Sequence, residues 1–280
     1  EFSAYIKKTE IEAGTAIGKA LNEDEAAPAP GSAAAAPVAD ADFGPTSTFA
    51  DFKAVFEPYC AETDSGKKLR KAGFRAADPN GNGLCSLAEL ETFVLAQLVI
   101  KYPKSLTEKD HRGDPLEKGK DLFDAFRPSY IRAFNDAKDF KADTGKVLEG
   151  TKSSTNDDFV SFGEFKLFCQ YLIIYGGMFD AFARIDGGGS GRDANDDRKM
   201  TPEEWMAGYK SVKGYGFVCL DSIKDDKAAM AMFKAIDGNG GGVVLLDEFS
   251  EYIKKTEIAA GTETGKSLAE LNDEWKASVR

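Results

Sequence analysis

The most constraining feature of this sequence is a twelve-residue segment, residues 78–89, which reads DPNGNGLCSLAE. Its first, third, fifth, ninth and twelfth residues carry side-chain oxygens, and its sixth is a glycine. A hard cation such as calcium takes about six to eight oxygen ligands, and this spacing supplies them from one loop. The expected ligands are Asp78, Asn80, Asn82, Ser86 and Glu89 through their side chains and Leu84 through its carbonyl. The segment therefore predicts a calcium-binding loop.

The residues that flank this loop fit two helices. Phe74 and Ala77 give the preceding segment an apolar face, and Ser86 with Glu89 forms a capping box at the start of the following one. Gly83 stands at a sharp bend, where a positive φ disfavours any side chain. A helix, a loop of this kind and a second helix make an EF-hand. The alternative is a Gly/Asn-rich turn between two helices that binds no metal.

A further candidate, the third loop in chain order, is residues 193–204, DANDDRKMTPEE, which we interpret as displaced by a seven-residue Gly-rich insertion. Arg198 replaces the bend glycine, at an expected cost of about 1 kcal/mol in backbone strain. Thr201, Pro202 and Glu204 form a helix start. The expected ligands are Asp193, Asn195, Asp197, Thr201 and Glu204, with Lys199 offering its carbonyl. A metal-free acidic turn is the alternative.

Two other loops carry weaker patterns. In the fourth, residues 237–248 (DGNGGGVVLLDE), binding and non-binding are both open. Its expected ligands are Asp237, Asn239, Gly241, Val243 and Glu248, of which Gly241 and Val243 offer backbone atoms only. In the second, residues 153–164 (SSTNDDFVSFGE), Ser153 stands at the first-ligand position and Asp158 at the bend. We expect this second loop to be a structural partner without metal.

Four such loops in succession predict an all-α protein with two lobes of paired EF-hands, because a single EF-hand leaves an apolar face unburied. Short β contacts are expected between the paired loops. Helices are expected near residues 49–60, 64–77, 87–100, 116–140, 162–175, 178–185, 202–213, 226–236 and 246–271. The expected divisions are an exit helix of a preceding repeat at 1–21, an Ala/Pro-rich linker at 22–47, an N-terminal EF-hand pair at 48–175 and a C-terminal pair at 176–280.

The exit-helix prediction comes from an internal repeat. Residues 1–20 and 248–267 match at fifteen of twenty positions. Because Glu248 is the last ligand of the fourth loop, Glu1 would be the last ligand of an earlier one. We therefore expect one unit of a tandem array, in which residues 1–21 are dispensable for metal binding.

Composition excludes several classes of function. A net charge of −11 disfavours nucleic acid as a partner. Four widely spaced cysteines without a CxxC pair are typical of reduced thiols in an intracellular protein. The single histidine lies in a polar stretch, and no nucleophile–base pair or phosphate loop is visible, so an enzyme is not expected. No apolar run is long enough to cross a bilayer.

The four loops, the imperfect second loop and the segments YIRAFNDAKDF, DDFVSFGEFKLFCQYLIIY and MFDAFARID resemble the calflagins, flagellar calcium-binding proteins of trypanosomatids. The likeness covers roughly residues 60–270. It implies a calcium sensor whose fold responds to the ion, in a flagellar or membrane-associated setting, with calcium carried by the C-terminal pair. The location that we expect is intracellular, either cytoplasmic or cytoskeletal, and flagellar if the resemblance holds. Membrane anchoring does not transfer, because the sequence shows no N-terminal Met-Gly-Cys for acylation, and membrane association is left open.

These patterns together predict a calcium-responsive sensor that changes shape or its contacts with a protein partner. That partner would be a helix or a neighbouring repeat of the same chain. A contractile or scaffolding cytoskeletal repeat and a passive calcium buffer are the alternatives.

Overall fold

The computed structural model describes residues 44–105, 107–110, 112–138, 158–186 and 198–269. All of them belong to one compact unit, Pro37–Arg280. The predicted exit helix at 1–21 and most of the predicted linker at 22–47 lie outside the described residues.

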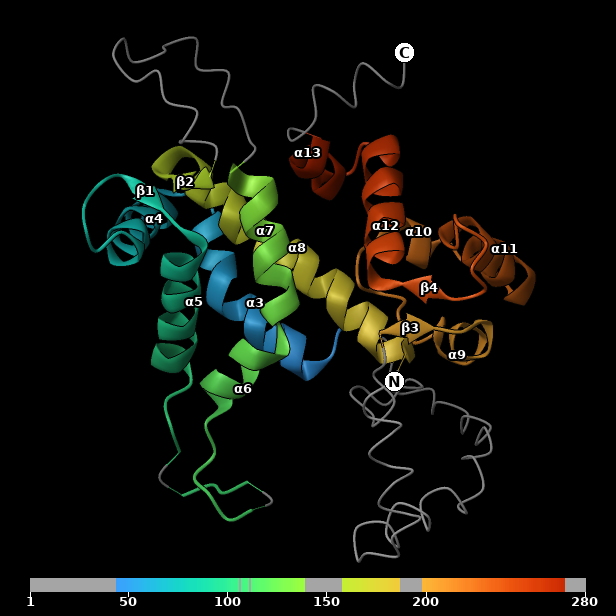
Figure 1. Ribbon diagram of the computed structural model, residues 1–280, viewed down its shortest axis with the longest axis horizontal. Helices are drawn as coiled ribbons and strands as arrows, with labels where there is room; N and C mark the ends of the chain where they lie inside the picture. The colour runs from blue at the N-terminus through green and yellow to red at the C-terminus, as the bar shows by residue number, and fades with distance from the viewer. Residues whose placement is uncertain (1–43, 106, 111, 139–157, 187–197, 270–280) are drawn as a thin grey trace, which may run out of the picture. The chain divides into compact units, whose positions relative to one another are not determined.

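The described part is mostly helical, in agreement with the predicted all-α class (Figure 1). The helices are α3 (Ser47–Cys60), α4 (Asp64–Ala77), α5 (Leu87–Lys101), α6 (Lys118–Ala125), α7 (Arg127–Lys138), α8 (Phe162–Asp186), α9 (Pro202–Gly208), α10 (Val218–Asp221), α11 (Asp226–Ile236), α12 (Leu246–Ala260) and α13 (Glu263–Ala269). Within the described ranges, no helix combines the length and the apolar character that crossing a membrane requires.

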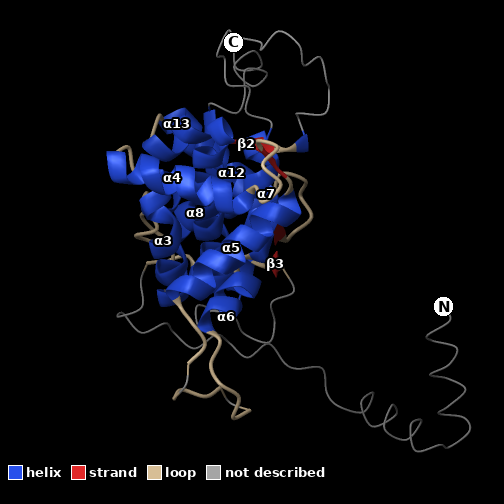
Figure 2. Cartoon of the chain, turned by 90° about the vertical axis from the view of Figure 1, so that its left-hand side faces the viewer, coloured by secondary structure: helices blue, strands red, loops and turns tan. Residues whose placement is uncertain are grey.

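Four two-residue strands form two short antiparallel sheets, and each sheet joins two of the predicted loops. The strands are β1 (Leu84–Cys85), β2 (Val160–Ser161), β3 (Lys199–Met200) and β4 (Val244–Leu245). β1 pairs with β2 and β3 with β4; β2 and β3 are labelled in Figure 2. The opposed residues are Leu84 and Ser161, Cys85 and Val160, Lys199 and Leu245, and Met200 and Val244. In both sheets the residues at the eighth loop position oppose each other and are fully buried: Cys85 and Val160 in one, Met200 and Val244 in the other.

The helices predicted at 162–175 and 178–185 are in fact one continuous helix of 25 residues, α8. Gly176 and Gly177 do not break it, because they are sites of close packing. A Cβ atom on Gly176 would lie 3.2 Å from Cε1 of Phe52, and one on Gly177 would lie 3.1 Å from Cζ of Phe49. Contact with these α3 rings offsets the helix cost of glycine, which is roughly 0.5–1 kcal/mol per residue. The predicted division between residues 175 and 176 therefore falls inside a helix.

Two other predicted helices are interrupted. The helix predicted at 116–140 is divided at Phe126 because Pro128 has no N–H and belongs in a first turn, so α7 begins anew at Arg127. The helix predicted at 246–271 ends at Gly261, whose φ of +63° makes a left-handed cap, and α13 follows. The short helix α10 was not predicted.

The core of the described part is aromatic and surrounds α8. Helices α3, α4 and α7 pack against α8, as do α9 and α12. Phe52, Tyr130, Phe165, Phe182 and Trp205 have at most 1% of their surface exposed. The loops are thus attached to helices that share one packed interior.

Candidate metal-binding loops

The first loop connects the end of α4 to the start of α5 and is folded by its own predicted ligands. The two carboxylate oxygens of Asp78 accept hydrogen bonds from the N–H groups of Asn82, at 3.1 Å, and Gly83, at 2.9 Å. Oδ1 of Asn82 accepts a bond from the N–H of Leu84 at 2.8 Å. Gly83 has a φ of +81°, as expected for the bend. The acidic first position therefore lies against the backbone of the bend.

The twelfth position, Glu89, closes the first loop. Its Oε1 accepts a hydrogen bond from Nδ2 of Asn80 at 2.9 Å. Its Oε2 accepts bonds from the N–H and the hydroxyl of Ser86, both at 2.8 Å. The predicted capping box is confirmed. Glu89 thus links the third and ninth loop positions, and the predicted oxygen donors meet within one short loop.

The fourth loop repeats this geometry with fewer side chains. Asp237 accepts hydrogen bonds from the N–H groups of the fifth and sixth positions, Gly241 and Gly242, at 2.9 and 3.0 Å. Nδ2 of Asn239 donates to Oε1 of Glu248 at 2.6 Å. The other oxygen of Glu248 accepts a bond from the backbone N–H of the ninth position at 3.0 Å. The loop keeps the closure of the first loop but lacks oxygen-bearing side chains at its fifth and ninth positions.

Only the second half of the third loop is described. Arg198 has a φ of +61°, and no other non-glycine residue within the described ranges has a positive φ. The predicted capping box at Thr201 and Glu204 is confirmed, with the N–H of Thr201 donating to Oε2 of Glu204 at 2.8 Å. Lys199 lies in β3. The predicted ligands Asp193, Asn195 and Asp197 lie outside the described residues.

The second loop keeps the strand and the cap but not the bend. The N–H of Ser161 donates to Oε2 of Glu164 at 2.7 Å, as in the other loops. Asp158, at the bend position, does not have a positive φ. Its Oδ1 lies 3.7 Å from Nζ of Lys138. Ser153 lies outside the described residues. That the second loop is a structural partner without metal remains a prediction.

The donor chemistry fits a hard cation. Among the described residues, no three His, Cys, Asp or Glu side chains form a group able to hold a metal. The first and fourth loops each offer two carboxylates at ligand positions; amide and carbonyl oxygens add to both sets, and the Ser86 hydroxyl adds to the first. Oxygen donors of this kind suit calcium rather than softer metals.

The neighbouring thiol does not add a ligand. Cys85 is buried in β1, and its pKa is raised to about 12 by burial and by the nearby charges of Asp78 and Glu89. It therefore stays protonated at neutral pH, whereas metal binding requires the thiolate.

No family model and no curated protein matches this chain. The interpretation of the loops therefore depends on their own geometry.

Sequence reasoning missed the direct bond between the third and twelfth loop positions. Asn80 and Asn239 both form it, and both are amides that can donate to a glutamate. An aspartate at the third position has no such donor when ionised. The shared asparagine was therefore an available signal.

Proposed function

We propose that this chain is an EF-hand calcium-binding protein whose first and fourth loops bind the ion. The observation that carries the proposal is that the first and fourth loops share one set of internal hydrogen bonds. In each, the first residue accepts bonds from the bend and an asparagine joins the last glutamate. Each loop also pairs through a two-residue strand with a second loop, which supports two EF-hand pairs.

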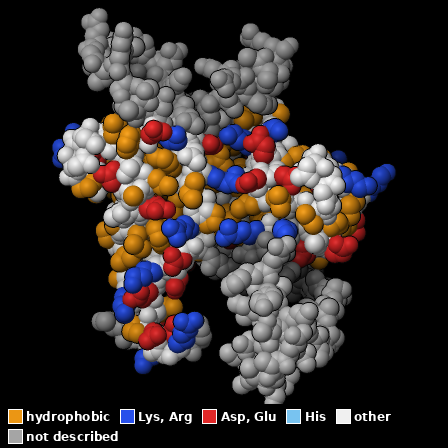
Figure 3. Space-filling model, viewed as in Figure 1, with side chains coloured by type: hydrophobic (Ala, Val, Ile, Leu, Met, Phe, Trp, Pro, Cys, Tyr) orange, Lys and Arg blue, Asp and Glu red, His pale blue; other side chains and the backbone are white. Residues whose placement is uncertain are grey.

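We further propose a calcium-responsive unit, similar to the calflagins, that contacts a protein partner in a cytoplasmic or cytoskeletal setting. The two pairs of loops share helix α8. A movement of one pair would therefore act on a helix that the other pair also contacts. The net charge of −11 disfavours a nucleic-acid partner, as do the interspersed acidic and basic side chains on the face drawn in Figure 3. A contractile or scaffolding repeat would use the same response along an array.

A passive calcium buffer is the second candidate. It is favoured by the packing of α3, whose aromatic residues already cover apolar surface between the helices of the first two loops. A sensor exposes such surface on binding calcium, and a buffer does not. Fluorescence of a hydrophobic dye with and without calcium separates the two.

The calcium sites are tested by titration calorimetry on the full chain. Glu89→Gln and Glu248→Gln each keep the side-chain shape but remove the charge of the twelfth ligand, so each variant should lose one binding site. The matched controls Glu91→Gln on α5 and Glu251→Gln on α12 should leave the stoichiometry unchanged. Unchanged stoichiometry in both ligand variants, with helicity retained by circular dichroism, would contradict the proposal.

A further inference from the structure

Three asparagines in the candidate loops are each followed by a glycine. They are Asn80 and Asn82 in the first loop and Asn239 in the fourth. Because glycine has no side chain to shield its backbone nitrogen, that nitrogen can approach the side-chain amide of the preceding residue closely. All three asparagines and their glycines are exposed and lie outside the helices and strands. These dipeptides are therefore places where the backbone can react with a side chain.

The side-chain amide of Asn80 is held at both of its ends. Its Oδ1 accepts a hydrogen bond from the N–H of Asn82 at 2.9 Å, and its Nδ2 donates to Oε1 of Glu89 at 2.9 Å. A nucleophile that adds to an amide carbon moves negative charge onto the amide oxygen. An N–H donor that already lies at this oxygen stabilises that charge. The first loop therefore favours attack on the side-chain carbon of Asn80.

The side-chain amide of Asn239 is held in the same way. Its Oδ1 accepts a hydrogen bond from the N–H of Gly241 at 2.7 Å, and its Nδ2 donates to Oε1 of Glu248 at 2.6 Å. The fourth loop thus places a donor at the amide oxygen of its own third residue. The same arrangement occurs in two loops of different sequence.

The backbone nitrogens that would attack these two amides are only weakly held. The N–H of Gly81 donates to the carbonyl of Asp78, and that of Gly240 to the carbonyl of Asp237, both at 3.3 Å. N–H···O bonds in proteins usually span about 2.7–3.2 Å. Long bonds of this kind resist loss of the N–H proton very little, and the nitrogen must lose that proton when it forms a new bond to carbon.

Asn82 has the same dipeptide but a different nucleophile. Its Oδ1 accepts a hydrogen bond from the N–H of Leu84 at 2.8 Å, so its amide oxygen also has a donor. The N–H of Gly83, however, donates to a carboxylate oxygen of Asp78 at 2.9 Å. A hydrogen bond to a charged acceptor is roughly twice as strong as one between neutral groups. The structure therefore distinguishes Asn82 from Asn80 within one loop.

We propose that Asn80 and Asn239 are sites of spontaneous hydrolytic deamidation, and that Asp78 protects Asn82 from the same reaction. The glycine nitrogen forms a bond to Cγ of the asparagine, the bond from Cγ to Nδ2 breaks, and ammonia leaves with the proton of the glycine N–H. The product is a cyclic imide. Water then opens the imide at Cγ, which gives aspartate, or at the backbone carbonyl carbon, which gives isoaspartate. Water is the co-reactant, and the reaction does not involve the calcium proposed above.

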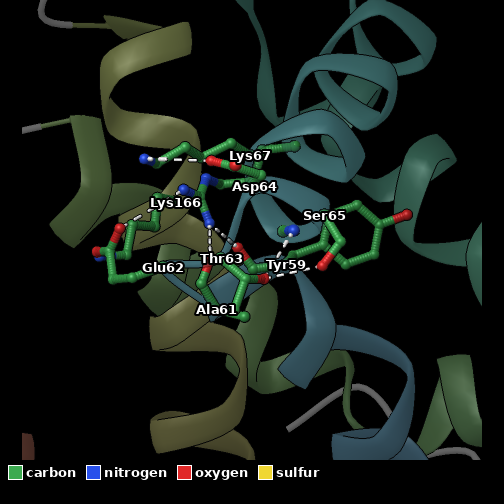
Figure 4. Close-up of polar contacts among 10 residues, drawn as sticks. Tyr59, Ala61, Glu62, Thr63, Asp64, Ser65, Lys67 and Lys166 are labelled. Atoms are coloured by element: carbon green, nitrogen blue, oxygen red, sulfur yellow. Dashed lines mark hydrogen bonds and ion pairs between the residues drawn. The ribbon is translucent and has the colours of Figure 1, made fainter.

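Deamidation removes the bond that closes each loop. Either product carries a carboxylate in place of the amide, so it repels Glu89 or Glu248 instead of donating to it. A glutamate paired with a cation could tolerate this charge, as Glu62 could beside Lys166 (Figure 4). Glu89 and Glu248 are instead bonded to N–H and hydroxyl groups. The modification therefore opens the metal-free loop, and isoaspartate also lengthens its backbone.

The test follows the full chain in excess chelator, at physiological temperature and mildly alkaline pH. Samples taken over time are digested with an acid protease, and tandem mass spectrometry measures the gain in mass at each asparagine. Asn80 and Asn239 should convert to a mixture of aspartate and isoaspartate. Because a carboxylate holds the N–H of Gly83, Asn82 should convert at least about tenfold more slowly than Asn80. The matched control is Asn135, which is exposed but lies within α7 and should not convert.

Two comparisons separate the geometry of the loop from the reactivity of the dipeptide. In concentrated urea the hydrogen bonds of the loop are lost, so Asn80 and Asn82 should convert at equal rates. In folded Asp78→Asn, a neutral acceptor faces the N–H of Gly83, and Asn82 should convert roughly threefold faster than in the wild type. The introduced amide precedes Pro79, which has no N–H, and so cannot form the imide itself.

Three results would overturn the proposal. In the folded chain, Asn80 and Asn239 could convert no faster than Asn135, or Asn82 could convert as fast as Asn80. A slower conversion of Asn82 that persists in urea would mean that Asp78 does not protect it. Should Asp78→Asn fail to fold, the urea comparison alone decides. A failed calcium titration would not affect this result, because chelator is present throughout.

Discussion

The sixth position of three loops adopts a positive φ, although its residue differs. Gly83 and Gly242 have φ values of +81° and +79°, and Arg198 has +61°. A side chain at positive φ costs roughly 1–2 kcal/mol because its Cβ crowds the backbone. Arg198 therefore carries backbone strain at the position where the loop pattern places the bend.

Replacing Arg198 with glycine should therefore stabilise the metal-free protein. We expect a gain of about 0.5–1 kcal/mol in the free energy of unfolding, since relief of strain exceeds the added entropy of the unfolded chain. Urea denaturation in excess chelator measures it. Arg198→Ala keeps the Cβ and should show no gain; an equal gain in both variants would mean that charge, and not backbone strain, is responsible.

Residue spacing predicted the bend and the capping boxes, because these follow from local sequence. It did not predict that Asn80 would turn its amide toward Glu89. That orientation depends on competing hydrogen bonds within the loop, which become visible only when the backbone is placed.

Among the elements, α8 departs most from expectation. A Gly-Gly pair in the sequence indicates a break between helices, yet Gly176 and Gly177 lie mid-helix against Phe52 and Phe49. The glycines are small so that α3 can approach closely. This role could not be predicted from the sequence, because the contacting rings lie more than a hundred residues away.

A larger residue at this contact should weaken the fold. Gly177→Val would place its Cβ 3.1 Å from the Phe49 ring, and we expect a loss of about 1–3 kcal/mol in the free energy of unfolding from overpacking. Gly163→Ala is the matched control on the same helix, since its Cβ would meet only the Ser161 hydroxyl at 3.8 Å. It should be neutral or stabilising. Thermal denaturation compares the two, and equal stability would contradict a packing role.

At the scale of the whole molecule, the buried core of the described part runs from Phe49 to Leu268. Sequence analysis predicted the helical class and the short β contacts, whose residues Cys85, Val160, Met200 and Val244 belong to this core. It did not foresee that α3 would fill apolar surface, because its pattern is that of any amphipathic helix. The partners of such a helix are set by tertiary contacts.

Deleting residues 1–30 should leave the calcium stoichiometry of the chain unchanged, because the proposed ligands lie within residues 78–248. Titration calorimetry checks this. Light scattering on the same samples should show reduced self-association if residues 1–21 mediate contact between units. Loss of a calcium site would show instead that this segment belongs to the fold of the unit.

Because α8 is continuous, it sets the orientation of the two sheets relative to each other about its axis. β2 ends where α8 begins, and near the other end of α8 Phe182 packs against Phe249 of α12, the helix that follows β4. Each residue of an α-helix advances the chain by about 1.5 Å and turns it by about 100°. One residue inserted in the middle of α8 would therefore rotate one pair of loops relative to the other, about the axis of α8, by about 100°. The length of α8 fixes the direction in which each pair faces.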